Sequence, residues 1–300
     1  MFSSVDCITV LCGLIAFNLK VSPRRNYVGE APPRSGLLCA LCQASTTMSK
    51  AHIPPRCANN TGSTVTRGRP YIEDQVRQWE SPKEGGLWLK TVCRDCNILA
   101  SKYDDAYGAF ANALLPHISG HPLSLPSSDG VPPVAVAPGR VARSVLHAMV
   151  ALAPSFNVID RRFVRQLLED VDYTRLPAGM RLRLAMTSDT HARIASAYHS
   201  HRVIGEPQDY EAFAEIYFRP LVWLLTGESS TFGSSLPDQE RWGDATDWIA
   251  YSRDAYRTDL RDVLKALPRT VHPSRRRGSA DEWIEMSGPT SYVLEGRIAA

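Results

Sequence analysis

The sequence lacks any run of about 20 apolar residues, the length that a helix needs to cross a bilayer. Its longest apolar run, residues 8–17, is much shorter, and Asp6 precedes this run where a secretory signal carries positive charge. We therefore expect no membrane partner. We interpret residues 1–34 as an extension and linker, or as an over-long start of the reading frame, with an inverted signal anchor as the alternative.

The chain also has little net charge and few cysteines. A formal charge of +3 over 300 residues does not by itself indicate a nucleic-acid partner. The seven cysteines do not resemble the disulfide framework of a secreted protein, which favours a reducing, cytoplasmic location. A hydrophobic fraction of 44% is sufficient for a packed core.

Four of the cysteines form two C-x-x-C pairs, Cys39 with Cys42 and Cys93 with Cys96. Four thiolates satisfy a tetrahedral Zn²⁺ with no open position, so the spacing predicts a structural zinc site. About 50 residues separate the pairs, more than a compact zinc ribbon needs. We therefore expect the zinc to join a knuckle to a distant helix. Cys57, between the pairs, is interpreted as a small hydrophobic residue of the core or as an incidental thiol.

Hydrophobic periodicity predicts one helix that begins at Cys93 and ends before Pro116. A stretch rich in Pro, Ser and Gly follows at residues 117–140 and is interpreted as a linker. Beyond it, the patterns predict helices and strands without an internal repeat or a catalytic signature. These are helices at 141–152, 160–171 and 259–267, a hairpin of strands at 181–186 and 191–198, and an apolar strand run at 215–225 that is broken at Pro220.

The segment between the cysteine pairs is basic, because residues 49–70 contain four Lys or Arg and no Asp or Glu. Such a segment fits either contact with phosphate or a solvated loop. The same alternatives apply to the basic triplet at residues 275–277. Trp79 and Trp88 fit either stacking on bases or packing in a core or lid, and packing is the more common role.

The order of motifs resembles the HNH endonuclease family. A C-x-x-C pair is followed by His52-Ile53-Pro54-Pro55, and then by a second C-x-x-C pair with Asn97 directly after it. The resemblance covers about residues 37–115. It implies an α+β chain with an N-terminal ββα-metal, or treble-clef, zinc module at residues 35–116. A mixed α+β domain of unassigned role would follow at residues 141–300.

The resemblance also implies a chemistry, namely hydrolysis of a DNA phosphodiester bond by an HNH-type endonuclease. His52 matches the general base that takes a proton from the attacking water. Asn97 matches a residue that helps to hold a catalytic Mg²⁺ or Mn²⁺ ion. Arg56 and Lys50 are suited to the substrate phosphate. The structural zinc would be held by Cys39, Cys42, Cys93 and Cys96.

One position departs from the family, and it leaves a second function open. Many members carry a metal-ligating residue directly before the base, whereas this chain has Ala51. Asp104 or Asp105 could substitute, but on one continuous helix Asp104 would lie roughly 10 Å along the axis from Asn97, and a solvated face is the simpler interpretation. The alternative function is a catalytically silent zinc-stabilised adaptor that binds nucleic acid or protein.

In that alternative, His52 is a hydrogen-bonded structural residue, and Asn97 caps the helix or braces the loop that carries His52. A third possibility is that residues 141–300 are the working part and the zinc module only docks them. The choice between DNA and RNA, the sequence preference and the oligomeric state do not follow from the sequence.

Overall fold

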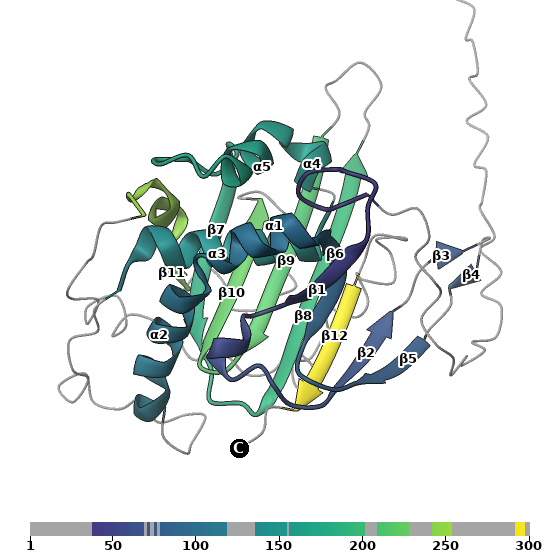
Figure 1. The fold of residues 1–300 in the computed structure, drawn as a ribbon, viewed down its shortest axis with the longest axis vertical. Coiled ribbons are helices and arrows are strands. Elements are labelled where there is room, and N and C mark those ends of the chain that lie inside the picture. The colour runs from purple at the N-terminus through teal and green to yellow at the C-terminus, as the bar shows by residue number, and fades with distance from the viewer. Residues whose placement is uncertain are drawn as a thin grey trace, which may run out of the picture.

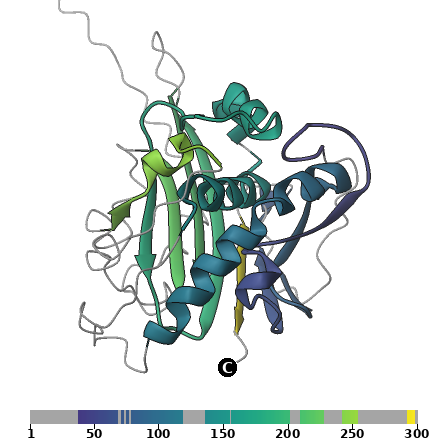
Figure 2. The same ribbon diagram turned by 60° about the vertical axis from the view of Figure 1, so that its left-hand side comes forward.

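The computed structural model describes residues 38–68, 71–72, 75–76, 79–118, 136–154, 156–201, 209–227, 242–253 and 292–297. They form a mixed α+β fold, as predicted, with helices against one face of a large antiparallel sheet (Figure 1). Figure 2 shows the two layers side on. The predictions for residues 1–34, 259–267 and 275–277 lie outside the described residues. No described helix is long and apolar enough to cross a membrane.

Five helices follow one another along the described part of the chain. They are α1 Arg94–Ser101, α2 Asp104–Leu114, α3 Pro138–Leu152, α4 Phe156–Ile159 and α5 Arg161–Leu168, with short 3-10 turns η1 Arg56–Ala58, η2 Leu115–His117 and η5 Thr246–Ala250. The strands are β1 Met48–His52, β2 Thr64–Gly68, β3 Tyr71–Ile72, β4 Gln75–Val76, β5 Trp79–Lys83, β6 Trp88–Cys93, β7 Met180–Met186, β8 His191–His201, β9 Asp209–Phe218, β10 Leu221–Gly227, β11 Gly243–Asp244 and β12 Tyr292–Arg297.

The large sheet has eight strands in the order β11-β7-β10-β9-β8-β12-β2-β5. The predicted strands are present, and the predicted break at Pro220 is confirmed as the turn between β9 and β10. The predicted hairpin of β7 and β8 is wrong, because β10 and β9 lie between them. Local sequence favours a turn after Met186, but all seven residues of β7 pair with β10.

A smaller two-stranded sheet, β1 paired with β6, leads directly into α1 (Figure 1). The strands run antiparallel, with His52 opposite Trp88 and Met48 opposite Cys93. The register shifts between Ser49 and Ala51, so the ladder is interrupted at Lys50. The two strands therefore place His52 and the second cysteine pair at opposite ends of one short sheet.

The single helix predicted from Cys93 is divided in two. Cys93 is the N-cap of α1, so the predicted position of this helix start is confirmed. However, α1 ends at Ser101, and α2 begins at Asp104. Two adjacent carboxylates at a helix start interact favourably with the helix dipole, which explains why a new helix begins at this point. The second helix ends at Leu114, before Pro116, as expected.

Aromatic contacts fix α2 against the large sheet. Tyr107 lies 6.5 Å from Trp223 of β10, between ring centroids, and Phe110 lies 5.9 Å from Trp248 of η5. Trp223 and Trp248 are themselves in edge-to-face contact at 5.8 Å. Aromatic pairs of this kind each add roughly 0.5–1.5 kcal/mol beyond burial. The segments before and after residues 117–140 thus share one core.

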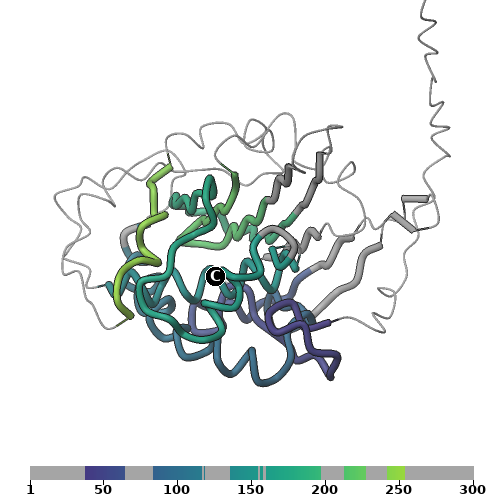
Figure 3. The backbone as a smooth tube through the Cα atoms, turned by 90° about the horizontal axis from the view of Figure 1, so that it is seen from above, coloured from purple at the N-terminus to yellow at the C-terminus, as the bar shows by residue number. Residues whose placement is uncertain are grey.

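Helix α3 lies between the small sheet and the large one. Its two last carbonyls, which have no partner within the helix, accept hydrogen bonds from strand side chains. Thr91 Oγ1 of β6 donates to Ala151 O at 2.6 Å, and Ser196 Oγ of β8 donates to Leu152 O at 3.1 Å. Figure 3 shows from above how the N-terminal segment, in purple and blue, packs along one side of the large sheet. The exact domain boundaries stay a prediction.

Candidate metal centre and active-site pocket

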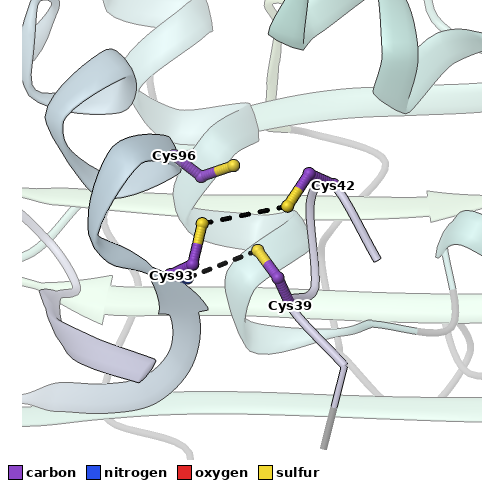
Figure 4. A group of neighbouring side chains, drawn as sticks. All are labelled: Cys39, Cys42, Cys93 and Cys96. Carbon is purple, nitrogen blue, oxygen red and sulfur yellow. Dashed lines mark hydrogen bonds between the residues drawn. The ribbon is translucent and has the colours of Figure 1, made fainter. Parts of the chain in front are cut away.

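The four predicted zinc ligands lie together (Figure 4). Their Sγ atoms are all within 4.8 Å of one another. Cys42 Sγ and Cys93 Sγ are 3.8 Å apart. A tetrahedral Zn²⁺ with Zn–S bonds of about 2.3 Å sets its sulfurs about 3.8 Å apart, whereas a disulfide requires about 2.05 Å. The donor set and its spacing therefore fit a closed zinc site, and these cysteines are free thiols in the structure.

The backbone around the sulfurs also fits a bound cation. The N–H of Cys93 donates to Cys39 Sγ at 3.3 Å. Burial acts to raise the pKa of Cys39, but backbone donors at Cys93, Cys42 and Leu41 outweigh it and lower the pKa of this thiol. Burial, followed by the neighbouring thiols, raises the pKa of Cys96. Four crowded thiols of this kind ionise together only around a metal ion.

The metal centre fixes the start of α1 against the knuckle at residues 39–44. The knuckle is a tight turn in which Gln43 N donates to Cys39 O at 2.9 Å, and Gln43 adopts a left-handed φ of 61°. The second cysteine pair lies in the first turn of α1. Binding of one ion to both segments therefore sets where α1 lies relative to β1 and β6.

His52 is held at the end of β1 by one hydrogen bond. Its Nε2 lies 3.0 Å from the carbonyl oxygen of Gly85. Because a carbonyl only accepts, Nε2 carries the proton, and in the neutral ring Nδ1 keeps its lone pair. Burial lowers the pKa of His52, the Gly85 carbonyl opposes this, and the charges of Arg56 and Lys50 lower it further. The imidazole is therefore neutral at physiological pH, as a general base requires.

Asn97 connects α1, the helix that starts at the four-cysteine site, to the strand that carries His52. Its Nδ2 donates to the backbone oxygen of Lys50 at 3.1 Å, at the point where the β1–β6 ladder is interrupted. Sequence reasoning left two roles open for Asn97, and this contact supports the brace. Ligation of a catalytic ion by Asn97 stays a prediction.

Asn60 was not predicted as a site residue, and its hydrogen bonds fix the turn that follows His52. It is 1% exposed, and its Nδ2 donates to Pro54 O at 2.5 Å and to Leu87 O at 2.9 Å. Its Oδ1 accepts from Leu87 N at 2.7 Å. The signal in the sequence was the pair Gly85-Gly86, because a Cβ on Gly86 would clash with the carbonyl oxygen of Asn60. Asn60 therefore joins the turn after His52 to the start of β6.

The predicted site residues converge on one pocket of about 220 Å³. His52, Asn97, Arg56 and Lys50 all line it, so the structure brings together every non-cysteine residue that the resemblance implied. The other wall comes from α2 and α3. It carries three polar groups: Asp104, which the sequence analysis considered as a substitute ligand, and Ser144 and His147, which it did not indicate.

This wall contains two titratable groups, the partly buried Asp104 and the buried His147. Burial raises the pKa of Asp104 to about 6, although Ser144 Oγ donates to its Oδ1 at 3.1 Å and acts in the opposite direction. Burial lowers the pKa of His147 to about 4, and its Nδ1 is held 2.8 Å from Arg143 O. His147 also stacks on Tyr103 at 5.9 Å. These contacts indicate that His147 is a neutral packing residue.

Other residues singled out in the sequence lie outside the pocket. Trp88 is not among the residues that line the pocket, and Nζ of Lys50 lies 4.4 Å from the centre of its ring in a cation–π contact. Asp105 points away and pairs with Arg140 at 2.9 Å, as expected for a solvated face. Cys57 is exposed, and its Sγ donates to Asp104 O at 3.0 Å. The side chain of Trp79 is not described.

No protein-family model, curated protein or solved structure matches this chain. Among the described residues, the four cysteines are the one group of three or more His, Cys, Asp or Glu side chains close enough to share a metal ion. Function therefore has to be argued from the metal centre and the pocket.

Proposed function

We propose that this protein is a metal-dependent endonuclease of the HNH type that hydrolyses phosphodiester bonds in DNA. The observation that carries the proposal is the state of His52. Its Nε2–H is engaged by Gly85, its pKa is lowered by burial, and it lines a pocket with two basic side chains, Lys50 and Arg56. This combination supplies a neutral base beside groups that attract phosphate.

The arrangement of elements supports the proposal. The cysteine knuckle, the antiparallel pair β1 and β6, and the helix α1 that starts at the second cysteine pair resemble the parts of a ββα-metal, or treble-clef, module, with β2 to β5 inserted between the two paired strands. In this interpretation the zinc has no contact with substrate. Its role is to hold α1, and Asn97 passes that position on to the strand that carries His52.

In the proposed reaction, Arg56 and Lys50 bind the scissile phosphate at the pocket. Nδ1 of His52 takes a proton from a water molecule, whose oxygen then attacks phosphorus, and the bond from phosphorus to the leaving oxygen breaks. The Gly85 carbonyl stabilises the imidazolium that results, because the Nε2–H is already directed at it. A bound Mg²⁺ or Mn²⁺ ion would stabilise charge on the phosphate and on the leaving oxygen.

Plasmid cleavage tests this proposal. The native chain, with zinc bound, is incubated with supercoiled plasmid and Mg²⁺ or Mn²⁺, beside His52→Ala. The control is His191→Ala, since this residue lies at the start of β8 and bonds to Asp189. We expect nicking by the native chain and the control but not by His52→Ala. Equal products from all three proteins would refute a nuclease that depends on His52.

One observation favours a second function, a catalytically silent adaptor. Ala51 lines the pocket where a metal ligand would strengthen the site, and its side chain is 6% exposed. Retention of DNA in a gel shift, with no cleavage in either metal, supports the adaptor.

A further inference from the structure

The pocket contains one carboxylate, and its position differs from what the sequence suggested. Asp104 is the single Asp or Glu among the described residues that line the pocket. On a continuous helix, Asn97 and Asp104 would be roughly 10 Å apart along the axis. The break after Ser101 starts a new helix at Asp104, and both residues then line the same space.

Asp104 has no cationic partner among the described side chains. Its neighbour Asp105 pairs with Arg140, whereas among the described side chains the carboxylate of Asp104 has one hydrogen-bond partner, the hydroxyl of Ser144, at 3.1 Å. Burial raises the pKa of Asp104 to about 6, so at neutral pH the folded chain still holds an ionised carboxylate in a position that disfavours the charge. A bound cation would remove that cost.

A single carboxylate is consistent with what Mg²⁺ requires. This ion keeps several waters and is commonly bound through one or two carboxylates together with substrate phosphates. The opposite wall of the pocket carries Lys50 and Arg56, which attract phosphate, and His52, which is the proposed base. Ser144 fixes the orientation of the carboxylate, as outer hydrogen bonds do at metal sites.

We propose that Asp104 is the carboxylate that binds a divalent cation in this pocket, replacing the ligand that Ala51 cannot supply. The inference rests on the proposed endonuclease, in which this cation assists the reaction. The ligand comes from α2, the helix that is anchored on the large sheet through Trp223 and Trp248. The cation site thus joins the small metal-centred sheet to the rest of the fold.

Mn²⁺ binding measures the site without reference to cleavage. The full-length, zinc-loaded chain is titrated with Mn²⁺, and free Mn²⁺ is followed by its electron paramagnetic resonance signal. Asp104→Asn keeps an acceptor for Ser144 but loses the charge, and Asp105→Asn is the matched control on the exposed side of the same helix start. Zinc content and circular dichroism establish that each variant is folded.

We expect the native chain to bind one Mn²⁺ ion, Asp104→Asn to bind it at least about tenfold more weakly, and Asp105→Asn to bind it as the native chain does. A native chain that binds no Mn²⁺, or an Asp104→Asn variant with native affinity, overturns the inference. The plasmid assay distinguishes failure of the cation site from failure of the proposed nuclease. Binding through Asp104 without nicking supports the cation site and refutes the nuclease, whereas nicking by the native chain together with native Mn²⁺ affinity in Asp104→Asn refutes the cation site alone.

Discussion

The side chain of Asn97 donates a hydrogen bond of 3.1 Å to the backbone oxygen of Lys50, two residues before His52. Asn97 directly follows the last cysteine of the metal centre. The contact therefore joins α1, the helix that starts at the four cysteines, to β1, the strand that carries the proposed base. A metal ion held by these cysteines would act on the position of His52 through this hydrogen bond.

Replacement of Asn97 separates its two possible roles. Asn97→Asp keeps an oxygen that can bind a cation but loses the N–H donor, whereas Asn97→Ala loses both. If the brace to Lys50 is what matters, both variants should lower the nicking rate by about 10- to 100-fold, because a small displacement of a catalytic group has effects of this size. Plasmid nicking at fixed Mg²⁺ is the measurement. Native activity in Asn97→Asp alone would show that the oxygen, as a cation ligand, is the essential group.

Loss of one thiolate should empty the metal centre. Cys93→Ser is expected to reduce bound zinc from one ion per chain to almost none and to lower the melting temperature, because metal binding and folding are coupled at closed sites. Zinc stoichiometry after gel filtration and thermal unfolding report the two effects. Cys57→Ser is the control, since this exposed cysteine lies outside the group of four sulfurs. A Cys93→Ser chain that retains zinc would contradict the assignment.

Asp104→Asn should stabilise the protein at neutral pH. The pKa of Asp104 is about 6 in the folded chain, against an ordinary value of 3.8, so the folded state binds the proton more tightly. Stability from this group is therefore present below pH 3.8 and is lost as pH rises through 6. Without divalent cation, Asp104→Asn should exceed the native free energy of unfolding by up to about 3 kcal/mol at pH 7.

Urea unfolding at several pH values checks this prediction. The difference between Asp104→Asn and the native chain should shrink from pH 7 to pH 5. Asp105→Asn should show the opposite sign, because Arg140 and the Ala106 N–H lower the pKa of Asp105 despite partial burial. A stability difference that does not vary with pH would mean that the gain at Asp104 comes from packing.

Asn60→Ala should be strongly destabilising. The substitution removes three hydrogen bonds from a residue that is 1% exposed and leaves the partner groups at Pro54 and Leu87 without it. We expect a loss of about 2–4 kcal/mol in the free energy of unfolding, measured in urea. Ser63→Ala, at an exposed position in the same loop, should be within about 0.5 kcal/mol of the native chain. A cost at Asn60 as small as that at Ser63 would contradict the role of Asn60 as a clamp.

The parts of the site that could be predicted are those with local or chemically distinctive signals. The two C-x-x-C pairs specify a tetrahedral donor set wherever the fold places them, and the helix start at Cys93 follows from periodicity. Asp104 and Ser144 could not be paired in advance, because their contact depends on α3 crossing α2. The break between α1 and α2 could not be predicted from the sequence, since its residues are compatible with a continuous helix.

Strand partners were the least predictable part of the fold. The alternation in β7 and β8 correctly indicates strands, but it says nothing about which edges meet. The turn at residues 187–190 suggested a hairpin, whereas β10 and β9 are the hydrogen-bonded strands that lie between β7 and β8 in the sheet. Nothing in the sequence indicated that β2 belongs to the same sheet as β8.

The position of β12 has a consequence for biosynthesis. Strand β12 pairs with β8 on one side and with β2 on the other, and Thr64 of β2 lies opposite Gly296. During translation, β2 and β5 leave the ribosome long before the strand that joins them to the large sheet exists. The cysteine knuckle can bind zinc early, but the edge of β2 that pairs with β12 stays exposed until β12 has been synthesised. Such long-range pairing slows folding and leaves strand edges of the nascent chain open to aggregation.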